Sequence, residues 1–194
     1  MQIGIAERQK HQLEVGKLQD QINKLHEKIA GIRAKQPRKA VQDYALTAPN
    51  GKKVKLSQMF GKHDKLVVIH NMGFSCPMCT LWADGFNAQR YFADQYGGVS
   101  MVVVSPDKPK AQAAGIKKRG WTIPLYSSEG STFTDDMGFL GKPPAKWTGP
   151  LPGVSTFVKG KGGAVELYAQ DGFGPGDPYC GVFHLYRLLP EKKK

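Results

Sequence analysis

Two cysteines, Cys76 and Cys79, stand three residues apart, with a proline directly after the first. The apolar, mostly β-branched run at residues 66–70 predicts a buried strand, and a helix is predicted from Cys76 onward. The pair therefore opens a helix, where unpaired backbone N–H groups and the helix dipole favour a thiolate. Pro77 suits the first helical turn because its missing N–H is not needed there. We expect Cys76 to be a nucleophile and Cys79 the thiol that resolves a mixed disulfide.

A metal site is the main competing use of such a pair, because zinc takes thiolate and imidazole ligands. Zinc would need about two further ligands. Cys180 and His184, four residues apart on a predicted helix, and His70 are the available candidates. The chain has no second C-x-x-C and no H-x-x-x-H, so we expect no metal and no other cofactor. A structurally inert cysteine pair remains an open alternative.

From residue 40 onward, predicted strands and helices alternate, which indicates an α/β domain with a mostly parallel sheet and helices on both faces. A closing hairpin makes the predicted sheet mixed. The predicted strands are 41–46, 66–70, 99–104, 123–126, 154–158 and 165–168, and the predicted helices are 76–96, 110–119 and 179–189. Residues 138–153 are rich in Gly and Pro and predict a long loop. The working site is expected at the carboxyl end of strand 66–70.

Residues 1–35 contain no proline and predict one long helix, which Pro37 stops. Its apolar residues follow a three-and-four spacing typical of a heptad stripe: Val15, Leu18, Ile22, Leu25, Ile29 and Ile32. Two interpretations remain open, a helix packed on its own domain and an arm that forms a homodimer. We divide the chain into an amphipathic helix, residues 1–36, and an α/β domain, residues 37–194.

Charge and composition narrow the classes of partner. The formal net charge is +12, but no nucleic-acid recognition motif accompanies it, so a nucleic-acid partner is not expected. No apolar stretch is long enough for a membrane span, and the N-terminal residues lack the apolar core of a secretory signal. With three cysteines, the chain does not fit a secreted disulfide scaffold. We expect a soluble cytoplasmic protein in which the pair is redox-active rather than a permanent cross-link.

Several segments, which together span most of the chain, resemble thioredoxin-like proteins of the peroxiredoxin and membrane-tethered thioredoxin type. More closely, they resemble a bacterial thioredoxin-like branch catalogued as a domain of unknown function. The segments are the N-terminal helix, residues 44–57, 66–70, 76–87, 119–124 with 127–128, and 151–155. The resemblance implies a thioredoxin-like fold, with a central mixed sheet flanked by helices and a long N-terminal helical extension.

The resemblance also implies a thiol–disulfide oxidoreductase that takes a protein or small-molecule disulfide and is reduced by another dithiol. Thioredoxins carry a buried acid six residues before the first cysteine, where this chain has His70. An imidazole there can move the proton of Cys79, although a histidine hydrogen-bonded in the core is an equal alternative. The residues expected to contact substrate are Phe74, Pro77, Trp82, Val154 and Ser155.

Three departures from the relatives limit this expectation. Thioredoxins have a cis-proline before the strand that faces the cysteines, whereas Val154 or Ser155 occupies that place here. Peroxiredoxins have a threonine three residues before the reactive cysteine, and counted from Cys76 that position is Gly73. The strand at 154–158 also lacks the arginine that assists peroxidases. A reductase is therefore favoured over a peroxidase, with a non-catalytic or redox-sensing binding protein as the alternative.

Overall fold

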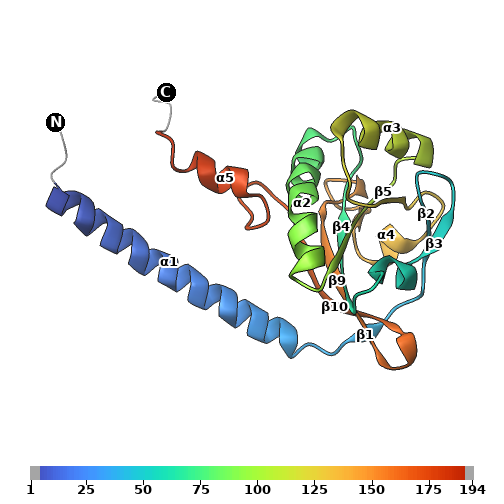
Figure 1. Ribbon diagram of the computed structural model, residues 1–194, viewed down its shortest axis with the longest axis horizontal. Helices are drawn as coiled ribbons and strands as arrows, with labels where there is room; N and C mark the ends of the chain where they lie inside the picture. The colour runs from blue at the N-terminus through green and yellow to red at the C-terminus, as the bar shows by residue number, and fades with distance from the viewer. Residues whose placement is uncertain (1–4, 191–194) are drawn as a thin grey trace. The chain divides into compact units, whose positions relative to one another are not determined.

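The chain is described over residues 5–190 by a computed structural model (Figure 1). Its contacts divide it between Pro37 and Arg38 into two units. The N-terminal unit contains one uninterrupted helix, α1 (Ile5–Ala34), which confirms the predicted long helix; residues 1–4 of that prediction lie outside the described range. The six apolar residues of the predicted stripe are 44–65% exposed along α1.

The second unit is built on an eight-stranded mixed sheet, as predicted. The strand order is β1-β10-β9-β4-β5-β6-β2-β3, with β4, β5 and β6 parallel and β9 antiparallel to β4. The strands are β1 (Lys39–Ala40), β2 (Ala45–Thr47), β3 (Lys53–Lys55), β4 (Lys65–His70), β5 (Ser100–Ser105), β6 (Leu125–Ser127), β9 (Gly153–Lys159) and β10 (Val165–Gly172).

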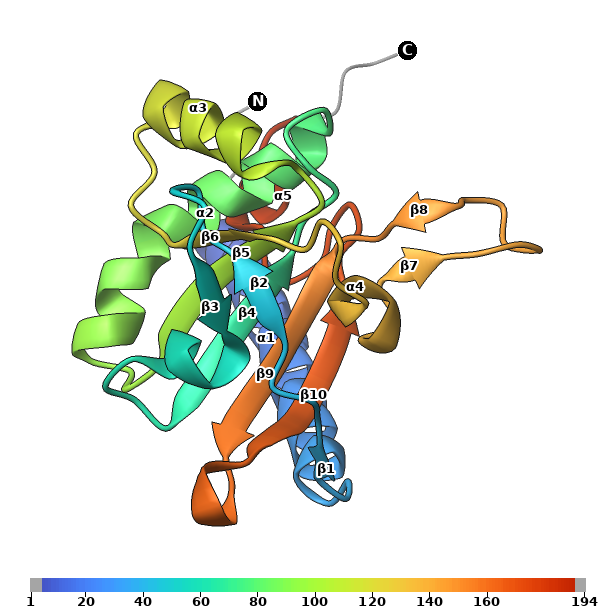
Figure 2. The ribbon, with the colours of Figure 1, turned by 90° about the vertical axis from the view of Figure 1, so that its right-hand side faces the viewer.

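Helices cover both faces of this sheet, and Figure 1 shows α2 on one side of β4 and β5 and α4 on the other. The helices are α2 (Pro77–Gln95), α3 (Pro109–Arg119), α4 (Phe133–Asp136) and α5 (Gly181–Tyr186), with 3-10 turns η1 (Leu56–Phe60) and η2 (Lys161–Gly163). Figure 2 turns the same ribbon so that α4 lies nearer the viewer than α2.

The two faces follow from the alternation of side chains along each strand. In β4, Leu66 and Val68 pack in a core cluster with Phe133 of α4. Ile69 packs in a second cluster with Trp82 of α2. Strand β4 is thus buried on both sides, which explains why its sequence is a continuous apolar run rather than an alternating one.

Three segments differ from expectation. Of the strand predicted at 41–46, only the last two residues are in a strand, β2, which pairs with β3 and β6, whereas residues 41–44 connect it to β1, which pairs with β10. The loop predicted at 138–153 contains a short ladder between β7 (Leu140–Gly141) and β8 (Gly149–Pro150). Helix α5 is shorter than predicted, because the Asp177 carboxylate accepts the N–H groups of Tyr179 and Cys180 and holds them in a turn. Within residues 5–190, no helix is long and apolar enough to cross a membrane.

Candidate functional site

Cys76 is the N-cap residue of α2, and its sulfur accepts a hydrogen bond from the backbone N–H of Cys79 at 3.3 Å. Pro77 occupies the first helical position, as predicted from its missing N–H. The start of a helix carries a partial positive charge, so both the hydrogen bond and the helix dipole favour negative charge on this sulfur. Cys76 is partly exposed, and its neighbours Ser75 and Pro77 are exposed.

Cys79 is in a different environment, since only 2% of its surface is exposed. Burial, together with its hydrogen bond to Cys76, raises the pKa of the Cys79 thiol to about 12. It therefore keeps its proton at neutral pH. Both cysteines, and Cys180, are free thiols. The pair thus combines one reachable sulfur with one buried, protonated sulfur.

The loop between β4 and α2 is fixed by side chains on both of its sides. Asn71 accepts the N–H of Gly73 at 2.7 Å and donates to the carbonyl of Cys79 at 3.0 Å. Asp107, which follows β5, accepts the N–H of Phe74 at 3.1 Å and the hydroxyl of Ser105 at 2.9 Å. These bonds set the direction in which the chain enters α2, and hence the position of the Cys76 sulfur.

Gly73 adopts a backbone conformation that requires glycine, with φ at +109°. A Cβ at this position would lie 2.9 Å and 3.0 Å from the two carboxylate oxygens of Asp107. The position that corresponds to the peroxiredoxin threonine, when counted from Cys76, therefore has no space for a β-branched side chain.

A groove of about 550 Å³ lies beside the loop, between Phe74 and the surface of α3. The ring of Phe74 stacks on Trp121, with centroids 5.3 Å apart, and covers Gly115, where a Cβ would meet the ring. Lys118 and Arg119 contribute positive charge to the same groove. Phe74, two residues before Cys76 in the sequence, is thus one wall of an open groove whose other lining residues are alanine, glycine and the basic Lys118 and Arg119.

His70 is buried on the face of the sheet away from α2. Its ring stacks on Phe139, with centroids 3.9 Å apart, and its Nε2 lies 2.8 Å from the hydroxyl of Ser155. Burial lowers the pKa of His70 to about 3, so the ring is neutral at neutral pH. This placement corrects the expected role in proton transfer to Cys79 and favours the alternative of a core histidine.

Some of the other residues predicted to contact substrate are buried, and some reach the surface. Ser155 is fully buried beside His70 and does not face the cysteines, while Val154 is paired with Ile69 on the α2 side of the sheet and is also buried. Trp82 is 4% exposed and donates its indole N–H to Asp177 at 3.0 Å. Of the predicted contact residues, Phe74 and Pro77 are therefore the two that reach the surface near Cys76.

Two residues that follow the cysteines on α2 hold the neighbouring loop in position. Asp84 accepts the indole N–H of Trp121 and an N–H of Arg119, each at 2.7 Å. Asn87 accepts the backbone N–H groups of Thr122 and Ile123. Asn71, Asp107 and Asn87 were not among the site residues predicted from the sequence. Asn71 and Asp107 could have been proposed from the sequence, since each follows the end of a buried strand.

The residues considered as metal ligands are not gathered at one place. His184 is bonded to the backbone carbonyl of Asp177, and Cys180 packs in the same apolar cluster as Trp82. Between residues 5 and 190, no three His, Cys, Asp or Glu side chains form a group that could hold a metal ion.

Comparison with known proteins gives one match over almost the whole chain. The sequence model described as "Bacterial protein of unknown function (DUF899)" matches residues 6–192. Among curated proteins, the chain is 32% identical over 136 residues to the chloroplastic peroxiredoxin Q of Populus jackii, covering 70% of this chain and 61% of that one. It is 30% identical over 132 residues to the chloroplastic peroxiredoxin Q of Sedum lineare, covering 68% of this chain and 67% of that one.

Solved structures with the same fold include the peroxiredoxin Q of Xanthomonas campestris, with a TM-score of 0.62 and 19% identity, covering 80% of this chain and 98% of that one. The peroxidoxin BcpB of Mycobacterium tuberculosis has a TM-score of 0.56 and 20% identity, covering 79% of this chain and 97% of that one. At these identities the likeness concerns the fold. The chain spans about three fifths of the length of the first curated relatives.

Proposed function

Because the chain belongs to the DUF899 family of bacterial proteins, a thioredoxin-like family distantly related to the peroxiredoxins, we propose that it is a thiol–disulfide oxidoreductase. Cys76 is the nucleophile and Cys79 the resolving thiol. The observation that carries this proposal is the contrast between the two sulfurs. Cys76 is reachable at a helix N-terminus, whereas Cys79 is buried, protonated and hydrogen-bonded to it.

The reaction follows from that contrast. The Cys76 thiolate attacks one sulfur of a substrate disulfide, which forms a mixed disulfide and releases the other sulfur as a thiolate. Cys79 then gives its proton to the departing substrate sulfur and attacks the sulfur of Cys76. The second substrate thiol leaves, and a Cys76–Cys79 disulfide remains. Two electrons pass from the pair to the substrate, and an external dithiol returns them in a second exchange.

The substrate class is a protein or small-molecule disulfide that enters beside Phe74. The groove between Phe74 and α3 offers an apolar wall for the group next to the disulfide, and Lys118 offers a positive charge at its rim. Pro77 and Met78, which directly follow Cys76, are exposed and add to the contact surface that we propose. Because the proposed reaction reduces the substrate and needs an external dithiol to restore the pair, we assign it to a reducing compartment, the cytoplasm.

A thiol peroxidase is the second candidate, and the peroxiredoxin relatives favour it. The threonine position of the peroxiredoxins can be counted in two ways here. Counted from Cys76 it is Gly73, which has no room for a side chain. Counted from Cys79 it is Cys76 itself, which would make the buried Cys79 the attacking sulfur. The exposure of the two sulfurs therefore favours disulfide exchange over peroxide reduction.

The two candidates are distinguished by measuring the oxidation of the reduced protein, once with a small aromatic disulfide and once with hydrogen peroxide. We expect the wild type to reduce the disulfide and Cys76→Ser to fall to the background rate. Cys180→Ser is the matched control and should react as the wild type does. A wild type that reacts with peroxide but not with the disulfide, through Cys79, would replace the reductase by a peroxidase.

A non-catalytic role is the alternative from another class, in which α1 forms a homodimer and the cysteines sense redox state. The exposed apolar stripe of α1 favours this alternative. Sedimentation of Leu18→Glu, with Gln21→Glu as the control outside the stripe, tests it. A dimer lost only in Leu18→Glu, together with a disulfide-exchange rate that Cys76→Ser leaves unchanged, would support the binding role.

A further inference from the structure

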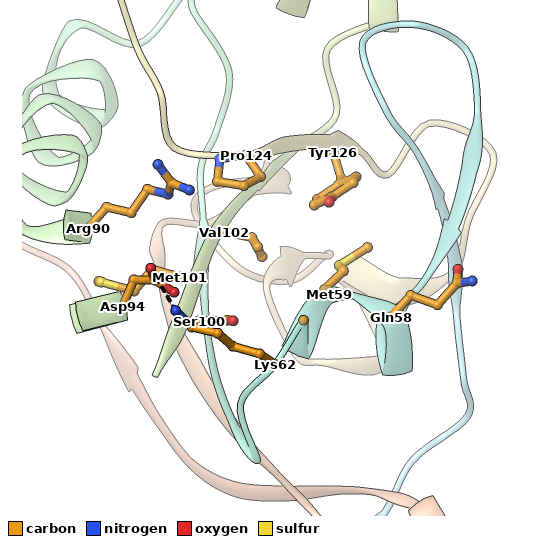
Figure 3. A pocket seen from close by; sticks show the side chains of 11 residues that line it. Gln58, Met59, Lys62, Arg90, Asp94, Ser100, Met101, Val102, Pro124 and Tyr126 are labelled. Carbon is orange, nitrogen blue, oxygen red and sulfur yellow. Dashed lines mark hydrogen bonds and ion pairs between the residues drawn. The ribbon is translucent and has the colours of Figure 1, made fainter. Parts of the chain in front are cut away.

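A second pocket lies far from the cysteines, near the other end of α2. It has a volume of about 380 Å³, which is at the small end of the range for small-molecule sites, roughly 300–1,000 Å³. Arg90 and Asp94 reach it from α2, Met59 from η1, and Tyr126 from β6 (Figure 3). Arg90 lies fourteen residues after Cys76, or about 20 Å along the helix, so this pocket is separate from the proposed redox site.

Arg90 is the unusual member of this pocket. Four residues later on the same helix, Asp94 is the natural ion-pair partner, yet the two do not pair. The Asp94 carboxylate instead accepts hydrogen bonds from His63 at 2.8 Å, Lys62 at 3.5 Å and Gln95 at 2.6 Å. The guanidinium of Arg90 makes no hydrogen bond or ion pair with any residue from 5 to 190. Figure 3 shows it directed away from Asp94 and toward Pro124.

Tyr126 supplies a second unused polar group. Its hydroxyl makes no hydrogen bond within the described part of the chain, and Figure 3 shows it reaching the pocket from the side opposite Arg90. Burial raises the pKa of Tyr126, so the hydroxyl stays protonated and available as a donor. Figure 3 shows Pro124 and Val102 between these two donors and Met59 near Tyr126, while Met101 lies beside Asp94.

We propose that this pocket binds a small organic monocarboxylate, with its carboxylate on Arg90 and its carbon body on Pro124, Val102 and Met59, directed toward Tyr126. A guanidinium presents two parallel N–H donors that match the two oxygens of a carboxylate. Because the charges of Lys62 and Asp94 offset each other, the uncompensated charge of the lining is that of Arg90, which matches one negative charge. The apolar part of the lining, with Met59, Val102 and Pro124, favours a ligand with a carbon body, which inorganic anions lack. This inference does not depend on the proposed redox function.

Titration of the full-length protein with benzoate, followed by amide chemical shifts, tests the assignment. We expect saturable shifts at Ser100, Met101 and Tyr126. Arg90→Met should weaken benzoate binding about tenfold or more, because a charge-assisted pair is lost, whereas Tyr126→Phe should change it by less than about twofold, because benzoate has no polar group at that end. Arg38→Met is the matched control outside the pocket, and Cys76→Ser should bind benzoate like the wild type.

Two related compounds separate the parts of the proposal. Benzyl alcohol has the same ring without the charge, and inorganic phosphate has the charge without the ring; both should bind more weakly than benzoate. Phosphate binding as tight as benzoate binding would overturn the monocarboxylate assignment. Benzoate shifts that are absent from the pocket, or unchanged affinity in Arg90→Met, would overturn the site itself.

Discussion

Gly73→Ala perturbs the loop that sets the position of Cys76, and its effect can be worked out from two observations. The first is the backbone, since φ at +109° is a region where a residue with a Cβ costs about 1–3 kcal/mol. The second is the contact with Asp107, whose oxygens would lie 2.9 Å and 3.0 Å from the new Cβ. Asp107 cannot turn away without giving up Phe74 N–H and the Ser105 hydroxyl, at about 1 kcal/mol each.

Gly73→Ala should therefore lower the free energy of unfolding by about 2–5 kcal/mol and slow the alkylation of Cys76. Urea unfolding followed by tryptophan fluorescence measures the first, and mass spectrometry of alkylated protein the second. Gly85→Ala is the matched control. Gly85 lies within α2 with nothing within 4 Å of an added Cβ, so the substitution should stabilise the protein by about 0.5–1 kcal/mol.

A double-mutant cycle with Asp107→Ala separates the two causes. In that background the contact is absent, so Gly73→Ala should cost about 1–3 kcal/mol from the backbone alone. An equal cost in both backgrounds would refute the contact with Asp107. A Gly73→Ala protein as stable as Gly85→Ala would refute the whole description of the loop.

His70 is buried and neutral, with its pKa lowered to about 3. Its contribution to the free energy of unfolding is therefore fully present above the unfolded pKa of about 6.5 and is lost as pH falls toward 3. Between pH 7 and pH 5 the wild type should lose about 2 kcal/mol more than His70→Phe in urea unfolding, and equal losses would contradict the buried neutral ring. Asp84→Ala removes the acceptor of the Trp121 indole, so we expect a loss of about 1–2 kcal/mol and altered tryptophan emission, and an unchanged protein would contradict the anchoring role. Lys118→Glu should slow the reaction with a dianionic aromatic disulfide about threefold to tenfold at low salt, whereas Lys161→Glu should not. Equal rates in these two variants would exclude the groove as the entry path.

Local patterns were enough to predict the start of α2 and the position of Cys76 at its N-cap. A buried strand, a short loop and a proline after the cysteine all lie within a dozen residues. The mixed sheet was likewise predicted from local patterns, namely the alternation of strands and helices and the closing hairpin. The long helix α1 was also predictable, since its spacing repeats over several turns.

The role of His70 could not be predicted because it depends on which face of β4 the side chain takes. That strand is buried on both faces, so its apolar run carries no alternation from which the face can be determined. The contacts of Asp107 with Phe74, 33 residues away, and of Asn87 with the chain before β6 are likewise tertiary. The pattern of either segment alone does not reveal such contacts.

The central claim is that the sulfur of Cys76 attacks the substrate and that of Cys79 resolves the product. The direct test is peptide mass spectrometry of Cys79→Ser after reaction with an excess of a small aromatic disulfide. The proposal predicts one stable mixed disulfide, located on Cys76, and none in Cys76→Ser. An adduct on Cys79 in Cys76→Ser that forms as fast as the Cys76 adduct in Cys79→Ser would contradict it, because the buried sulfur would then be the reactive one.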